Sequence, residues 1–91
     1  MTTIKMLAGS LSNDLFRVAT LKQRGSNSGA ARFLQEAKRW SVPLQKQHVA
    51  KYIQDIAQKV SLATTNNISL PQAELYLMYG ILLQNYSLHS K

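Results

Sequence analysis

Side chains that could do acid–base or metal chemistry are few in this sequence. Its 91 residues include two histidines and no cysteine, and its four carboxylates, Asp14, Glu36, Asp55 and Glu74, lie far apart along the chain. A general acid–base pair or a metal cluster needs several such groups close together, and a thiolate site needs cysteine. We therefore expect no enzyme activity, no cofactor and no metal site.

Three short features are typical of binding sites, and each also has an ordinary structural interpretation. His48 could act as a pH-sensitive group or as a half-buried structural histidine. Residues 26–29, Ser-Asn-Ser-Gly, precede an expected helix but lack the glycine and lysine placement of a phosphate loop. Trp40 follows Lys38 and Arg39, so its ring could stack on a base, lie at a lipid headgroup or pack in the core.

Positive charge is concentrated in the middle of the chain. The net charge is +7, and residues 17–59 carry the excess of cations, whereas the segments before and after are neutral. A field of this sign favours nucleic acid or the anionic inner face of a membrane, although net charges of about 2 to 8 also serve solubility. The predicted basic surface comprises Arg32, Lys38, Arg39, Lys46 and Lys51.

The chain has the size and composition of one globular unit. Residues 1–91 are expected to form a single domain, because a chain of this length supports one hydrophobic core. Hydrophobic residues make up 45%, no apolar run approaches the ~20 residues that span a bilayer, and the first residues do not resemble a secretory signal. The absence of cysteine also fits the cytoplasm, where we expect the protein, partly at the inner face of the membrane.

Apolar spacing predicts two helices in the first half of the chain. The first has an apolar stripe with steps of three and four, and residues 24–29 should break it with two glycines. The second should start at an Asn27 or Ser28 cap and end by Val42, because Pro43 disfavours helix in the residue before it. The first stripe consists of Ile4, Leu7, Leu11, Leu15, Val18 and Leu21.

Two more helices are predicted in the second half. The third should begin at Pro43, carry an apolar stripe from Leu44 through Val49 and Tyr52 to Val60, and stop at residues 64–67. The fourth begins with a capping box, in which Ser69 and Gln72 satisfy each other's backbone amides. The short connection predicts that these two helices are antiparallel neighbours. The expected fold class is therefore all-α, an antiparallel four-helix bundle.

The fourth helix has an unusual apolar character. Residues 75–83 read Leu-Tyr-Leu-Met-Tyr-Gly-Ile-Leu-Leu, so no side of this helix is clearly polar. A helix that is apolar all round is normally buried. We therefore expect it to be the central helix of the bundle, the alternative being a face reserved for a partner or a membrane surface.

In its layout the chain resembles the immunity proteins that lactic acid bacteria and their relatives make against pediocin-like (class IIa) bacteriocins. The likeness covers about residues 7–86, with Ser41-Val42-Pro43-Leu44 before a long third helix and a polar turn before Ser69-Leu70. The resemblance implies an antiparallel four-helix bundle that protects a producing cell. It also implies the partner, a membrane mannose phosphotransferase permease held open by the toxin, which the immunity protein blocks from the cytosolic side.

The resemblance places recognition on the C-terminal half. On this chain the partner-recognition residues would be Tyr76, Tyr79, Leu83, Tyr86 and Leu88. The alternative function is a small basic DNA- or RNA-binding regulator, which could form a homodimer through the last helix.

Overall fold

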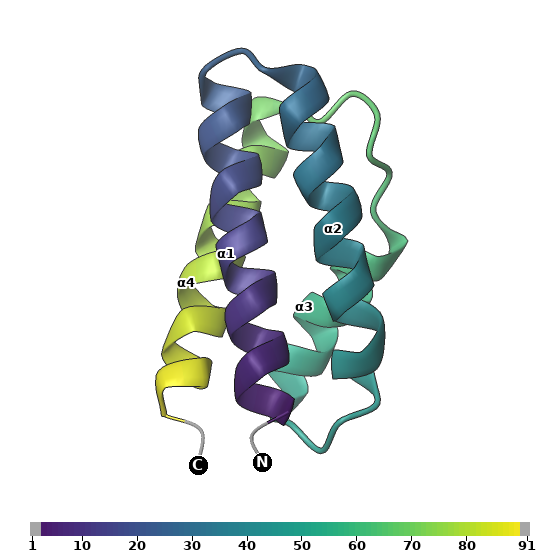
Figure 1. Ribbon diagram of the computed structural model, residues 1–91, viewed down its shortest axis with the longest axis vertical. Coiled ribbons are helices and arrows are strands. Elements are labelled where there is room, and N and C mark those ends of the chain that lie inside the picture. The colour runs from purple at the N-terminus through teal and green to yellow at the C-terminus, as the bar shows by residue number, and fades with distance from the viewer. Residues whose placement is uncertain (1–2, 90–91) are drawn as a thin grey trace.

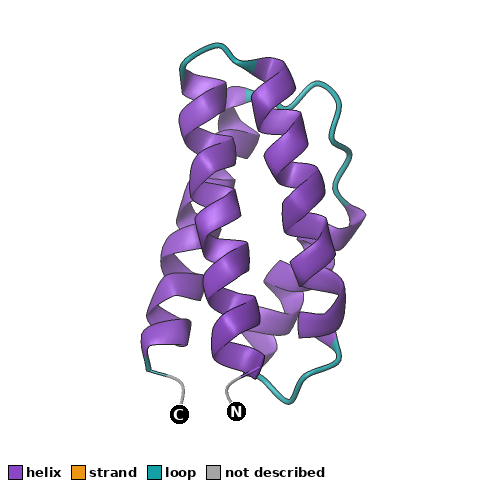
Figure 2. Cartoon of the chain, viewed as in Figure 1, coloured by secondary structure: helices purple, strands orange, loops and turns teal. Residues whose placement is uncertain are grey.

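The computed structural model describes residues 3–89, which form four helices joined by three connections. Consecutive helices run in opposite directions, and the described part of the chain contains no strand (Figures 1 and 2). The predicted all-α antiparallel four-helix bundle is confirmed. The helices are α1 (Thr3–Gln23), α2 (Asn27–Gln45), α3 (Lys51–Leu62) and α4 (Leu70–Leu88).

Helix α1 is the central helix of the bundle. It packs against α4 on one side and α2 on the other, and within residues 3–89 the backbones of α2 and α4 do not come close to each other. Its predicted apolar stripe is confirmed, because Leu7, Leu11, Leu15 and Val18 are all buried. The prediction that the last helix is central is wrong, since one side of α4 is exposed, while its other side packs mainly against α1 and touches α3 slightly.

The core is made of aliphatic side chains from all four helices. Full burial of each such side chain contributes about 1.5 to 3 kcal/mol, so a chain of this size depends on a compact set of them. The largest fully buried apolar side chains are Leu11, Leu15, Val18, Leu34, Leu44, Ile53, Val60 and Leu83.

Helix α2 was predicted to end by Val42, before Pro43. It instead continues through Pro43 to Gln45. A proline inside a helix removes one backbone hydrogen bond. Near the C-terminal end that loss is offset, because the extra turn buries Leu44 completely. The buried Ser41 hydroxyl is satisfied within the helix, because it donates to the carbonyl oxygen of Lys38 (2.9 Å).

Helix α3 is shorter than predicted because its start shifts from Pro43 to Lys51. The buried stripe of Ile53, Ile56, Ala57 and Val60 is confirmed, whereas Tyr52 is about half exposed. Helices α3 and α4 run antiparallel, as predicted, but they touch each other only slightly. Instead of turning back sharply, the 63–69 connection climbs the side of the bundle to the start of α4 (Figure 1).

The helix caps follow the predictions in part. At α4 the Ser69 hydroxyl accepts from the Gln72 backbone amide (3.2 Å) and the Gln72 side chain accepts from the Ser69 amide (2.9 Å), so the capping box is confirmed. At α2 the cap is Ser26 rather than Asn27 or Ser28, and its side chain makes no capping bond. Gly25, with φ of +83°, makes the turn that residues with a Cβ rarely adopt.

Candidate interaction surfaces

Helix α4 exposes a row of large apolar side chains on the side that faces away from the bundle. We call this row the α4 outer face. Each of its side chains is between 36% and 65% exposed, although single exposed apolar residues on a small protein need no explanation. A set of large exposed apolar side chains on one helix is typical of an interaction site. The α4 outer face consists of Leu75, Leu77, Met78, Ile81, Leu82 and Leu88.

Small residues on the inner side of α4 explain why the larger ones lie outside. Ala73, Gly80 and Ser87 recur at steps of seven and are all buried. At Gly80 the helices α1 and α4 approach closely: the Ser12 hydroxyl donates to the Gly80 carbonyl oxygen (2.7 Å), and a Cβ at this position would lie 2.8 Å from the Phe16 ring. Because small residues allow the closest helix packing, this side turns inward.

Three of the predicted recognition residues lie in the core. Tyr76, Tyr79 and Leu83 are at most 6% exposed, and the two tyrosine rings pack together with centroids 6.3 Å apart. Burial, together with the neighbouring Tyr79, raises the pKa of the Tyr76 hydroxyl. A partner could not reach these side chains unless α4 separated from α1.

The other two predicted recognition residues stand at the C-terminal end of α4. Leu88 is 65% exposed and belongs to the α4 outer face. Tyr86 is half-buried and joins α4 to the start of α3: its hydroxyl accepts from the Ala50 amide (3.2 Å), and its ring meets Tyr52 edge-on, with centroids 6.1 Å apart. Tyr86 therefore stabilises the bundle at this end.

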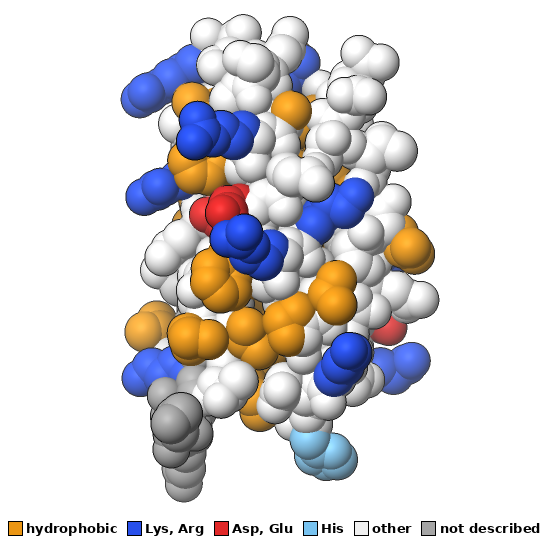
Figure 3. Space-filling view, turned by 45° about the vertical axis from the view of Figure 1, so that its right-hand side comes forward, with side chains coloured by type: hydrophobic (Ala, Val, Ile, Leu, Met, Phe, Trp, Pro, Cys, Tyr) orange, Lys and Arg blue, Asp and Glu red, His pale blue; other side chains and the backbone are white. Residues whose placement is uncertain are grey.

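The predicted basic surface is not one continuous patch. Figure 3 shows Lys and Arg side chains distributed along the height of the molecule, with hydrophobic and neutral side chains between them. Lys46 lies in the connection after α2, and Lys51 is the first residue of α3, where it forms an exposed 3.9 Å ion pair with Asp55. Only Arg32, Lys38 and Arg39 lie together, on α2.

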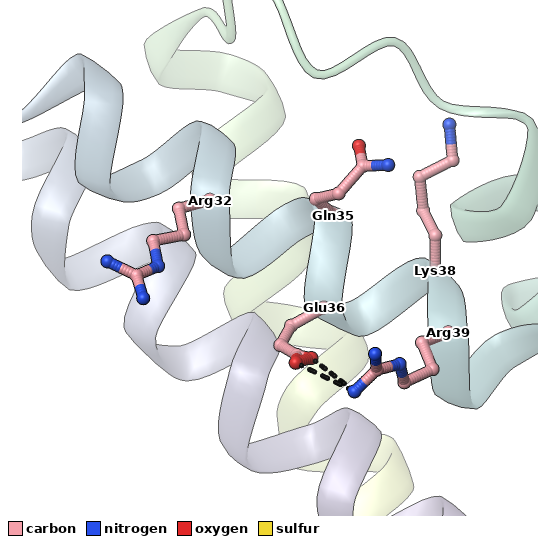
Figure 4. A pocket seen from close by; sticks show the side chains of 5 residues that line it. All are labelled: Arg32, Gln35, Glu36, Lys38 and Arg39. Carbon is pink, nitrogen blue, oxygen red and sulfur yellow. Dashed lines mark hydrogen bonds and ion pairs between the residues drawn. The ribbon is translucent and has the colours of Figure 1, made fainter.

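These three cations border a shallow depression of about 570 Å³ on α2 (Figure 4). Two of them are already engaged: Lys38 Nζ donates to the carbonyl oxygen of Ala63 (2.7 Å), and the Arg39 guanidinium pairs with Glu36 (3.2 Å). In Figure 4, Arg32 extends away from Lys38. The depression is therefore a weak anion site at most. Its lining residues are Arg32, Gln35, Glu36, Lys38 and Arg39.

Trp40 and His48 have structural surroundings that differ from their suggested binding roles. Trp40 is partly buried, and its Nε1 donates to the Asp14 carboxylate (3.0 Å) across the α1–α2 interface. Burial raises the pKa of Asp14; the Trp40 hydrogen bond opposes that effect, Glu36 adds to it, and Arg17 opposes it. His48 lies exposed in the α2–α3 connection rather than in a helix.

The sequence analysis left open a free apolar side on this helix, but of the α4 outer face it identified only Leu88. The apolar run from residue 75 to 83 indicated that one side of the helix was spare, but not which one. The seven-residue spacing of Ala73, Gly80 and Ser87 was the signal that could have identified the inner side.

Neither a metal site nor a membrane-spanning helix is found among residues 3–89. No three His, Asp or Glu side chains in that range come close enough together to hold a metal ion. No helix there combines the length and hydropathy needed to cross a membrane. Comparisons with protein-family models, curated proteins and solved structures found no match for this chain.

Proposed function

We propose that this protein is a bacteriocin immunity protein, a binding protein without enzyme activity. It would protect its cell by binding, from the cytosolic side, a mannose phosphotransferase permease held open by a pediocin-like toxin, and by blocking the leak. The sequence resemblance and the four-helix architecture both support this proposal. The observation that carries it is the α4 outer face, a row of exposed apolar side chains that the bundle itself does not need.

The chemistry of the molecule suits a partner at a membrane. Helix α4 has Glu74 as its single charged residue, so burying its outer face takes at most one charge out of water. Full burial of one such side chain is worth about 1.5 to 3 kcal/mol, and these are already partly buried, so each would contribute about 1 kcal/mol. Recognition would thus depend on several residues together. The cationic remainder of the chain would favour the anionic inner leaflet.

Expression in a bacterium sensitive to pediocin-like toxins tests the proposal. The wild-type protein should raise tolerance to at least one toxin of a broad panel and leave tolerance to unrelated killing agents unchanged. Ile81→Glu should abolish protection, because it places a charge in the α4 outer face. Leu62→Glu is the matched control, since Leu62 is 74% exposed on α3, and it should protect like wild type. Absence of protection against every toxin despite good expression would refute the assignment.

Nucleic-acid binding is the second candidate function, favoured by the net charge of +7 and by the three cations on α2. Binding that neutralises several phosphates weakens steeply between about 50 and 200 mM salt. We expect weak, non-specific binding to duplex DNA at low salt, reduced further by Lys38→Glu with Arg39→Glu and measured by fluorescence anisotropy. Tight sequence-selective binding at physiological salt would make this the preferred function.

A further inference from the structure

We propose that the free protein forms a symmetric homodimer in which two α4 outer faces pack against each other. The inference rests on the surface of the molecule and does not require the proposed toxin-bound partner. Apolar side chains that are 36% to 65% exposed on one helix have no cover within residues 3–89, and a second copy of the chain offers the same apolar surface in return.

Charge favours α4 over every other helix as the contact between two copies. Each copy carries a net charge of +7, so two copies repel each other wherever their cations approach. All eleven Lys and Arg residues except Lys91 precede α4 in the sequence. Helix α4 itself carries no Lys or Arg, whereas α1, α2 and α3 each carry at least two, so a contact between two α4 helices brings fewer cations together than a contact through any other helix.

The position of the charged and apolar residues on α4 favours an antiparallel pair. The continuous apolar part of the α4 outer face runs from Leu75 to Leu82, with Met78 near its middle. In a two-fold symmetric dimer both copies use the same surface, so a residue that contacts a second residue of the other copy is matched by the reverse contact. An antiparallel pair brings Leu75 opposite Leu82 and Met78 close to the two-fold axis. It also keeps the two Glu74 side chains apart, whereas a parallel pair would bring them together.

Helix α4 is long enough to form a dimer of ordinary size. Its 19 residues span about 28 Å, at 1.5 Å per residue. A standard interface takes about 800 Å² from each partner, and the whole molecule exposes 5638 Å². The outer side of one of the four helices, with the edges of its neighbour α1, can supply an area of that order. We therefore expect a reversible dimer with a dissociation constant in the micromolar range.

Sedimentation velocity over about 1 to 100 μM protein tests the dimer, because that range brackets a micromolar dissociation constant. Wild type should shift from monomer to dimer, and Met78→Glu should remain monomeric over the whole range while its circular dichroism stays helical. Leu62→Glu, with the same charge placed on α3, should dimerise like wild type. Wild type that stays monomeric, or a dimer that Met78→Glu leaves intact, would overturn the proposal.

Disulfide trapping tests the antiparallel arrangement directly, because the chain contains no cysteine. Met78→Cys, close to the two-fold axis, should form a disulfide-linked dimer on mild oxidation, whereas Leu82→Cys, which an antiparallel pair places opposite Leu75 of the other copy, should form one far more slowly. Equal rates for the two variants would overturn the arrangement. Monomeric wild type that instead binds phosphatidylglycerol vesicles, and loses that binding in Met78→Glu, would assign the face to lipid. Protection from toxin is a separate measurement, so either proposal can fail without the other.

Discussion

Replacement of Leu83 and of Leu82 by alanine should have very different effects, although the two residues are adjacent and identical. Leu83 is fully buried, whereas Leu82 is 36% exposed. A buried Leu→Ala change removes apolar contacts and leaves a cavity, at a cost of about 2 to 5 kcal/mol. A domain of this size has a total stability of about 5 to 14 kcal/mol. Leu83→Ala should therefore remove a large share of the free energy of unfolding.

The loss of stability in Leu83→Ala should also lower its melting temperature. For a domain of 60 to 100 residues each kcal/mol corresponds to about 4 to 8 °C, so a loss of about 3 kcal/mol lowers the Tm by about 12 to 24 °C. Leu82→Ala should cost less than about 1 kcal/mol, because that side chain keeps much of its contact with water and alanine favours helix.

Urea unfolding and thermal melts followed by circular dichroism would measure both variants. They should be recorded at two protein concentrations, so that a change in self-association is separated from a change in folding. Equal losses of stability in the two variants, or a larger loss in Leu82→Ala, would refute the burial of Leu83 and the exposure of Leu82. The orientation of α4 would then be different from the one described.

Three further predictions concern single contacts. Asp14→Asn keeps an oxygen acceptor for Trp40 but removes the carboxyl group. Burial raises the pKa of that carboxyl above its ordinary value of 3.8. The stability that the protonated carboxyl contributes to wild type is lost as the pH rises through that raised pKa. The free energy of unfolding of Asp14→Asn, measured in urea, should therefore rise relative to that of wild type between pH 3 and pH 7. A fall relative to wild type would contradict this. Gly80→Ala should lower the Tm despite better helix propensity, since its Cβ would meet Phe16 at 2.8 Å, and Phe16→Leu should restore part of the loss. Ser69→Ala should cost about 1 kcal/mol in chemical unfolding and Ser69→Asp almost nothing, because only the latter keeps the capping acceptor.

Local signals in the sequence were sufficient where the chain has a clear period or a strong cap. The stripe of α1, the glycine turn before α2 and the capping box at Ser69 all depend on residues within a few positions of one another. Pro43 was interpreted by the same local rule and gave a wrong boundary. The deciding factor there is the burial of Leu44 in the core, which no local rule contains.

In helix α4, too, local sequence signals decided one part of the site and tertiary packing decided the other. The apolar run in α4 left two interpretations open, a central buried helix and a helix with a free apolar side, and the first of them was preferred and is wrong. The run could not assign Tyr76, Tyr79 and Leu83 to the core and Leu77 and Met78 to the surface, because a helix that is apolar all round has no phase in its pattern.

The sequence by itself determined the four helices, their order and the excess of apolar residues in the last one, since these follow from spacing, caps and composition. Only the tertiary structure decided which side of α4 is free. That choice depends on the fit between Gly80 and the α1 residues Ser12 and Phe16, contacts between residues more than 60 positions apart. Close packing of small residues draws one side of the helix inward, and the large aliphatic side chains on the other side are left for water or for a partner.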